Sequence, residues 1–340
     1  MARYSLVAFT LIGCVSLSAC STTQPASVSS STATPAPGTS GSPAVANEPA
    51  IKVMSCTQTL TFDRAPERVV LLGDDSIPFM NEMGLLDKVV ALGEPIPEGI
   101  YSDELMAKLS SIPLLDHVEN ATGGSQVSTE TLLAANPDLV VGYDSGADRA
   151  ALTQAGVPFY SPDAWCPDVK TSHAIFHDIN DEVRKYAAIF DVADEGEALI
   201  KRMNARVAEI KSMNATPRGT GMALYASQGK TTYTAYGNGS MVQPMFEAVG
   251  LENVYANRDE RIIRDTAIEA ILTENPGTVV LLYQRDDPEA LKQAFVALPG
   301  AQDLDAVKNN KVYALPFVYT DPPTPNTIEG VEKLNELLGS

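Results

Sequence analysis

The stretch Ser128–Tyr143, "STETLLAANPDLVVGY", has a counterpart far downstream at Thr266–Leu282, "TAIEAILTENPGTVVLL". In each copy an acidic residue, Glu130 or Glu269, stands seven residues before a proline. Proline ends a helix, and the β-branched run behind it favours a strand. Each copy therefore predicts a helix, a turn and a strand, and the repetition predicts two similarly built lobes.

Short apolar runs alternate with helical segments from Ile51 onward, which is typical of α/β units with mostly parallel sheets. The candidate strands are residues 68–73, 88–93, 138–143 and 157–161, then 221–227, 278–283 and 311–316. A second pair of segments, 81–91 and 247–256, repeats a helix that ends at glycine before a strand. We expect two Rossmann-like lobes, residues 51–172 and 194–340.

The segment between the lobes, residues 174–214, contains no proline and only one glycine, Gly196. Its apolar residues recur at helical steps: Ile175, Ile179, Val183, Ala187 and Phe190. This pattern predicts a single long bridging helix over residues 173–193, with a second helix after Asp194 opening the next lobe. Two helices that merely cover the lobes would show the same periodicity.

The composition describes a folded and strongly acidic protein. The 340 residues are 44% hydrophobic, and 24 basic against 43 acidic residues give a formal charge of −19. Such a charge opposes binding to nucleic acid and favours a soluble monomer. Most of these carboxylates are expected to form an ordinary solvated surface.

Residues 1–20 have the form of a secretory signal. Arg3 precedes the apolar run Tyr4–Leu17, which is too short to span a bilayer, and "LSAC" ends at Cys20. This ending resembles the bacterial lipobox, in which the cysteine is acylated, so we expect an exported protein lipid-anchored to the outer face of the cell membrane. An ordinary signal peptide is the alternative. Residues 21–50, rich in Ser, Thr, Pro, Ala and Gly, predict a disordered tether.

Two cysteines, Cys56 and Cys166, remain once Cys14 is removed with the signal and Cys20 carries lipid. In an oxidising compartment they predict a disulfide, which would contribute on the order of 4 kcal/mol by closing a long loop. Two small buried hydrophobic side chains are the alternative. No Cys/His spacing indicates zinc.

Taken together, these features resemble one known family. The segments "RVVLLGDDSIPFMNEMGLLDKVVALGEP" (68–95) and "TETLLAANPDLVVG" (129–142), with the lipobox and tether, are similar to the class III (cluster A) substrate-binding lipoproteins of ABC importers. The resemblance runs from Cys20 to the C-terminus. It implies a transport protein that is not an enzyme, needs no cofactor, and carries a ferric siderophore, haem or cobalamin to an ABC permease dimer with its associated ATPase.

The resemblance also assigns a role to the repeated acids. In this family an acidic residue on each lobe docks into arginine pockets of the permease, and Glu130 and Glu269 match those positions. Arginine–carboxylate pairing is directional, so two equivalent acids suit a partner with two subunits. A carboxylate near a helix N-terminus is also stabilised by the helix dipole, and the two readings are compatible.

In a two-lobed plan the ligand cleft is lined by loops after the carboxyl ends of the strands. This rule selects Asp74, Asp75, Tyr143, Asp144 and Trp165 in the first lobe, and Tyr225, Tyr233, Tyr236, Asn238, Tyr283, Arg285 and Tyr319 in the second. Tyr225 and Tyr283 could equally pack into the core.

The charge of the ligand remains open. Arg285 could counter an anionic ferric catecholate, although the acids beside it also suggest a solvated surface pair. Arg258, Arg261 and Arg264 could add positive potential. The carboxylates of the first lobe leave a neutral or cationic ferric hydroxamate open.

Other functions fit less well. The three histidines, His117, His173 and His177, all precede the second lobe, so direct binding of a metal ion is disfavoured. Haem, through a tyrosine, and cobalamin, on Trp165, remain alternatives. No G-x-S-x-G, H-E-x-x-H or phosphate-loop motif supports a secreted hydrolase. A structural surface lipoprotein would give no use for two matching acids.

Overall fold

The computed structural model describes residues 51–119, 124–225, 232–284 and 286–339. These residues all fall within one compact unit, Asn47–Ser340. None of their helices is both long enough and apolar enough to cross a membrane.

The first sheet is parallel throughout and runs in the order β4-β3-β7-β8. Its strands are β3 (Val69–Leu71), β4 (Val89–Leu92), β7 (Leu139–Val141) and β8 (Phe159–Tyr160). The residues of β3 and β7 are at most 1% exposed, because helices cover both faces of the sheet. An uninterrupted apolar run is what such a doubly covered strand requires.

Helices and two hairpins surround this sheet. The helices are α1 (Ile77–Glu82), α2 (Asp103–Ser110), α3 (Thr129–Ala134) and α4 (Arg149–Gln154), and the antiparallel pairs are β1 (Ile51–Ser55) with β2 (Gln58–Phe62) and β5 (Val118–Glu119) with β6 (Ser125–Gln126). The side chains of Ser102, Ser128 and Asp148 cap α2, α3 and α4 by accepting a backbone hydrogen bond.

The second sheet is mixed and runs in the order β12-β10-β9-β13-β14, with β11 also paired to β9. Its strands are β9 (Gly219–Tyr225), β10 (Tyr233–Tyr236), β11 (Leu251–Asn253), β12 (Ile262–Thr266), β13 (Thr278–Tyr283) and β14 (Val312–Pro316). Strand β13 is parallel to β9 and β14, whereas β10 is antiparallel to β9 and β12. The expectation of mostly parallel sheets is therefore confirmed, with an antiparallel edge formed by β10 and β12.

The helices of the second half are α7 (Val242–Ala248), α8 (Ile268–Glu274), α9 (Pro288–Val296), α10 (Asp305–Lys308) and α11 (Asn326–Gly339). The repeated sequence forms the same local structure in both halves, α3 followed by β7 and α8 followed by β13. In each copy the residue before the proline is an asparagine in the left-handed region, with φ 50° at Asn136 and 42° at Asn275. Asparagine tolerates this backbone, and the proline then prevents the helix from continuing.

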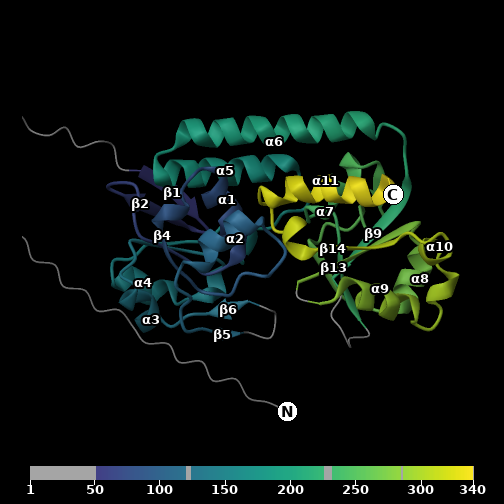
Figure 1. Cartoon of the computed structure of the whole chain (residues 1–340), viewed down its shortest axis with the longest axis horizontal. Helices are drawn as coiled ribbons and strands as arrows, with labels where there is room; N and C mark the ends of the chain where they lie inside the picture. Colours follow the sequence, from purple (N-terminus) through teal and green to yellow (C-terminus); the bar gives the residue numbers. More distant parts are fainter. Residues whose placement is uncertain (1–50, 120–123, 226–231, 285, 340) are drawn as a thin grey trace, which may run out of the picture. The chain divides into compact units, whose positions relative to one another are not determined.

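Two consecutive helices occupy the segment between the sheets, as the sequence predicted, with a turn between them (Figure 1). Helix α5 (Phe176–Phe190) ends at Asp191, whose left-handed backbone (φ 55°) turns the chain into α6 (Ala193–Met213). Gly196 lets them pack closely, since a Cβ there would lie 2.6 Å from that of Ala187.

The single long bridging helix over residues 173–193 is therefore not confirmed. Most buried residues of α5 belong to the core beside the first sheet. Helix α6 carries Leu199 and Val207 in that same core and Ile210 in the core beside the second sheet. Helix α6 therefore reaches both cores, as does α11, which carries Ile328 in the first core and Val331 in the second. Helix α6 begins at Ala193, where the bridging segment was expected to end.

Candidate ligand-binding site

A cavity of about 730 Å³ lies at the carboxyl ends of strands from both sheets. The first half lines it after β3, β4, β7 and β8 with Gly73, Asp74, Asp75, Glu94, Tyr143, Asp144 and Trp165. The second half lines it after β9, β13 and β14 and along β10 and β12 with Tyr225, Thr234, Tyr236, Arg261, Arg264, Tyr283, Gln284, Phe317, Asp321 and Thr324. This edge of an open α/β sheet is the usual place for a ligand.

Nine of the residues selected from the sequence line this cavity: Asp74, Asp75, Tyr143, Asp144, Trp165, Tyr225, Tyr233, Tyr236 and Tyr283. Arg285 lies outside the described residues. Two others, Asn238 and Tyr319, are placed elsewhere.

Asn238 and Tyr319 connect segments of the fold instead of lining the cavity. The side chain of Asn238 donates to the carbonyl of Ser172 (3.0 Å) and lies 2.7 Å from Nδ1 of His173. Tyr319 is 3% exposed, and its hydroxyl donates to the carbonyl of Ile100. Each side chain therefore links the second half of the chain to a segment of the first half or of the connection.

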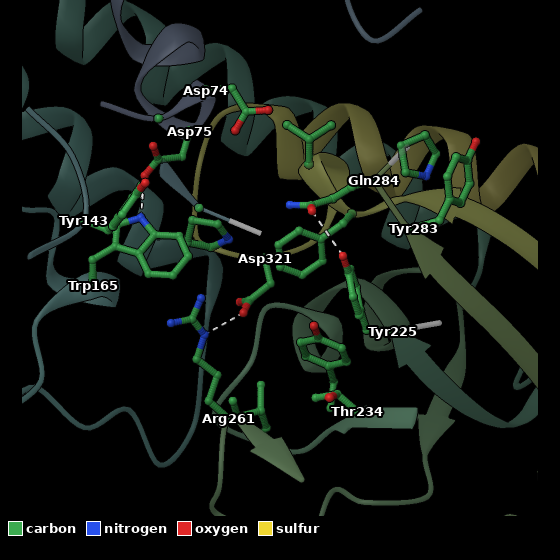
Figure 2. A pocket seen from close by; sticks show the side chains of 18 of the residues that line it. Asp74, Asp75, Tyr143, Trp165, Tyr225, Thr234, Arg261, Tyr283, Gln284 and Asp321 are labelled. Carbon is green, nitrogen blue, oxygen red and sulfur yellow. Dashed lines mark hydrogen bonds and ion pairs between the residues drawn. The ribbon is translucent and has the colours of Figure 1, made fainter. Parts of the chain in front are cut away.

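Asp75 lies in the wall of the cavity beside Trp165 (Figure 2). Its Oδ2 accepts a hydrogen bond of 2.5 Å from Nε1 of Trp165. Burial raises the pKa of this carboxyl group above its ordinary value, although the Trp165 hydrogen bond and the charge of Arg261 act in the opposite direction. Gly73 permits this arrangement, since a Cβ at that position would lie 2.7 Å from Oδ1 of Asp75.

A disulfide and two ring contacts hold Trp165. The neighbouring residue Cys166 is bonded to Cys56, which directly follows β1, with a Cα–Cα distance of 5.2 Å. Tyr143 approaches the indole edge-on at 6.1 Å between centroids. The guanidinium of Arg261 lies 5.2 Å from the indole centroid, within the range of a cation–π contact. The only tryptophan of the chain is thus fixed inside the cavity.

Arg261 joins the two halves at one side of the cavity. Its Nε donates to Oδ2 of Asp321 (2.5 Å), and its Nη1 donates to the carbonyl of Ala164 (2.6 Å), next to Trp165. Asp321 is 1% exposed and also accepts from the backbone of Met241 (3.2 Å). An arginine whose guanidinium donates to two different groups in this way has little rotational freedom left.

The sequence did not show which of the candidate arginines line the cavity, and it did not lead us to select Asp321. Arg261 and Arg264 line the cavity, whereas Arg258 pairs with exposed Glu260. Asp321 follows β14 in the same way that Asp74 follows β3, so the carboxyl-end rule could have selected it. Gln284 and Phe317 also follow strands, and the same rule could have selected them.

Aromatic rings cover the second half of the cavity. Phe317 packs against Tyr225 (5.4 Å between centroids) and Tyr236 (6.2 Å). The hydroxyl of Tyr225 donates to the side-chain oxygen of Gln284 (3.1 Å). Tyr233 packs against Phe295 in the core and offers less surface. These rings, edge-on or tilted toward one another, supply an aromatic surface in the second half of the cavity.

Tyr143 and Tyr236 remain neutral at physiological pH. Burial raises the pKa of Tyr143 and Tyr236 above the ordinary value, and nearby carboxylates raise both further. The hydroxyl of Tyr143 donates to the carbonyl of Ser125. They can therefore donate or accept hydrogen bonds toward a ligand but carry no charge.

Carboxyl groups outnumber cations in the described lining of the cavity. Six acidic side chains, those of Asp74, Asp75, Glu94, Asp144, Asp265 and Asp321, face two guanidinium groups, those of Arg261 and Arg264. Asp144 pairs with Arg149 (2.7 Å) and Asp321 with Arg261.

The described residues contain no group of three or more His, Cys, Asp or Glu side chains placed to hold a metal ion. His173 contacts Asn238. On the exposed side of α5, Nε2 of His177 lies 3.3 Å from Oδ1 of Asp181. The described lining of the cavity includes no histidine.

Glu130 and Glu269 occupy equivalent places in the repeat. Each lies in the first turn of its helix, α3 or α8, and each is exposed. Among the described residues neither carboxylate forms a salt bridge. Cys20 and the tether over residues 21–50 lie outside the described residues.

The family model for periplasmic binding proteins matches residues 70–319. The chain belongs to this family. This binding protein is of the class III type found in ABC transporters, a transport component and not an enzyme. Its fold is α/β with one parallel and one mixed sheet.

Relatives of this binding protein match along most of the chain. The crystal structure of an ABC-type Fe3+-hydroxamate transport system from Saccharomonospora viridis DSM 43017 is 34% identical, with TM-score 0.78, over 85% of this chain and 99% of that one. A vitamin B12-binding protein of Vibrio parahaemolyticus is 24% identical over 82% of this chain and 92% of its own length. The ABC transporter substrate-binding lipoprotein YvrC of Bacillus subtilis is 22% identical over 82% of each chain.

Proposed function

We propose that this protein is a lipid-anchored receptor that binds a ferric siderophore between two lobes and delivers it to an ABC permease dimer for iron uptake. The observation that carries this proposal is the cavity of about 730 Å³, which residues from both sheets line and which is within the usual size range for small-molecule sites. In this proposal residues 51–172 and 194–340 form the lobes, and residues 173–193 belong to their connection.

A hydroxamate is the favoured chelating class. The relative from Saccharomonospora viridis, at 34% identity, is described as part of an Fe3+-hydroxamate transport system. The lining agrees with this choice, because its excess of carboxyl groups would repel an anionic ferric catecholate. The rings of Trp165, Tyr225 and Phe317 offer apolar surface to the methylene chains of such a chelate.

Haem and cobalamin are the second candidates. Relatives named as vitamin B12-binding proteins support cobalamin, but their identity to this chain is 24% or lower. Haem would require an axial ligand, for which Tyr283 is a candidate in the described lining. The same receptor role would hold for either ligand.

Attachment to the membrane would come from Cys20, acylated at the lipobox, with residues 21–50 as the tether. The lipoprotein relative from Bacillus subtilis supports this assignment. A Cys20→Ala variant is then expected to appear in the soluble fraction, whereas the native sequence remains with the membrane. Mass spectrometry of the mature N-terminus would detect the lipid directly.

Docking to the permease would use Glu130 and Glu269. Their exposure and equivalent positions in the repeat support this role. Two exposed carboxylates without a salt-bridge partner in the described part of the chain are suited to bidentate pairing with arginines of a two-subunit partner.

Titration of the compact unit, residues 47–340, with four ligands tests the proposal. The ligands are a ferric trihydroxamate, a ferric triscatecholate, haem and cobalamin, each followed by Trp165 fluorescence and by calorimetry. The iron-free chelators are the controls. We expect submicromolar saturation by the ferric hydroxamate and weak binding of its iron-free form. Saturation by haem or cobalamin alone would replace the siderophore, and no binding at all would contradict the proposal.

A further inference from the structure

Asp75 and Thr324 each present a buried polar atom to the cavity wall that lacks a hydrogen-bond partner. Oδ1 of Asp75 and Oγ1 of Thr324 have none among the described residues. The two residues are 7% and 3% exposed, and both line the cavity. A buried polar atom without a partner is costly, so such atoms in a cavity wall indicate where a ligand would supply the missing interaction.

Asp75 also lacks a cation of its own in the described part of the chain. The guanidinium on the same side of the cavity, that of Arg261, is directed at Asp321 (2.5 Å) and at the carbonyl of Ala164 (2.6 Å). Its effect on Asp75 is smaller than that of burial or of the Trp165 hydrogen bond. A buried carboxylate with one side-chain donor and no counterion is unfavourable unless it is protonated or meets a positive charge.

The other acids of the lining act in the same direction. Asp74, Glu94 and Asp265 also line the cavity, together with Arg264, so carboxyl groups outnumber guanidinium groups in the described lining around Asp75. The backbone amide of Asp74 donates to Glu94 (3.0 Å), which brings that carboxylate next to the β3 loop that carries Asp75. Negative charge is therefore concentrated on the first half of the cavity.

We propose that the cavity selects iron chelates that carry a positively charged arm, and that the carboxylate of Asp75 holds this charge. The inference rests on the proposed function, because it specifies the ligand of the same site. An ammonium group would supply both the missing donor and the missing counterion. A neutral chelate of the same shape would leave Asp75 uncompensated.

Placing the charged arm against Asp75 is compatible with the surrounding geometry. Oδ2 of the carboxylate is engaged by Nε1 of Trp165, which leaves Oδ1 as the acceptor for the proton of the ligand. The aromatic wall formed by Tyr225 and Phe317 remains available for the apolar part of the chelate. The iron centre and the charged arm would thus occupy different parts of one cavity.

A matched pair of ligands tests this selectivity on the unmodified protein. One is a linear ferric trihydroxamate that ends in a primary ammonium group, and the other is its N-acetylated derivative, which differs chiefly in that charge. Calorimetry at pH 7.5 and low salt is expected to show at least about tenfold tighter binding of the ammonium form, since Coulomb attraction is strong in a partly dehydrated cavity. Equal affinities would overturn the inference.

The variant Asp75→Asn assigns the charge to this residue. Asparagine retains an acceptor for Trp165 and nearly the same volume but removes the negative charge. The preference for the ammonium form is expected to fall below about threefold, because the pairing contribution is lost. If Asp75→Asn is unstable on thermal unfolding, Asp75→Ser provides the same test.

Glu104→Gln is the matched control. Glu104 is on α2 outside the lining, its side chain is 83% exposed, and its substitution removes the same unit of charge. The control is expected to keep the full preference. A full preference in Asp75→Asn as well would overturn the assignment to Asp75.

The binding results distinguish a failure of the proposed function from a failure of the selection by charge. If neither form of the hydroxamate binds, the proposed function fails together with this inference. If both forms bind tightly and equally, the proposed function stands and only the selection by charge is wrong.

Discussion

Nε1 of Trp165 donates a hydrogen bond of 2.5 Å to Oδ2 of Asp75, and this contact joins the loops that follow β8 and β3. Cys166, the residue after Trp165, forms a disulfide with Cys56. The position of the indole therefore depends on two connections that are remote in sequence, which makes the ligand site sensitive to both.

Loss of the disulfide should destabilise the protein and loosen the site. The bond closes a loop of 110 residues, so removing it in Cys56→Ser/Cys166→Ser is expected to lower the free energy of unfolding by about 4 to 5 kcal/mol at most on the chain-entropy model. Urea titration with and without reductant measures the effect. Reductant should destabilise the native protein but not the double variant, and equal stability of the two oxidised proteins would contradict the prediction.

Arg261→Met should weaken both stability and ligand binding. The substitution leaves Asp321, which is 1% exposed, without its cation. We expect this loss to lower the free energy of unfolding by about 2 to 3 kcal/mol. The loss is smaller than for a fully buried ion pair because Arg261 is partly exposed. Arg264→Met is the control, since Arg264 lines the cavity without a salt bridge among the described residues.

A double variant separates the two roles of Arg261. Arg261→Met/Asp321→Asn removes both charges and should recover most of the stability. Affinity for the ferric hydroxamate should remain reduced by at least about tenfold, because the link to Ala164 and the contact with Trp165 are still missing. Recovery of affinity along with stability would show that Arg261 acts only through Asp321.

Glu182 on α5 should make stability depend on pH. Burial raises its pKa from 4.5 to about 7, while Lys185 and the hydroxyl of Tyr160 lower it by smaller amounts. The folded protein thus binds this proton more tightly than the unfolded chain does. Its contribution favours folding at low pH and is lost as the pH rises from about 4.5 through about 7, a change on the order of 3 kcal/mol.

The variant Glu182→Gln isolates this contribution. Because glutamine keeps an acceptor for Tyr160 and does not titrate, the variant should gain stability relative to the native protein between pH 5 and pH 8. Denaturant unfolding across this range measures the difference. A difference that is constant with pH would show that Glu182 is ionised in the folded state throughout.

Charge reversal at both docking candidates should abolish transport without affecting capture. Glu130→Lys/Glu269→Lys is expected to stop iron uptake by cells, since lysine repels the arginines proposed on the permease. Affinity for the ligand should stay unchanged. Glu104→Lys/Glu195→Lys, at exposed first-turn positions of α2 and α6, is the matched control. Loss of ligand affinity in the first variant would contradict the docking role.

Local sequence patterns predicted the parallel core well. The runs that became β3, β7 and β13 are apolar on both faces, and the prolines of the repeat end α3 and α8 where expected. Such features depend on residues close together in the chain. The carboxyl-end rule likewise brought Asp75, Trp165 and Tyr143 into one cavity, because parallel strands place their ends at the same edge.

Features that depend on distant contacts were harder to predict. The sequence of β10, Tyr-Thr-Ala-Tyr, resembles a polar loop. It forms a strand because β9 and β12 pair with it in antiparallel orientation. The turn at Asp191 contains neither glycine nor proline, and Gly196 lies inside α6 at its contact with α5. The role of Arg261 follows from Asp321 and Ala164, which are far away in sequence.

Anomalous diffraction at the iron absorption edge, from crystals of residues 47–340 grown with a ferric trihydroxamate, tests the central claim most directly. The account predicts one strong iron peak inside the cavity, between Trp165 and Phe317, with the chelate in contact with residues of both sheets. An iron peak bound elsewhere on the surface, or an empty cavity at saturating ligand, would contradict it.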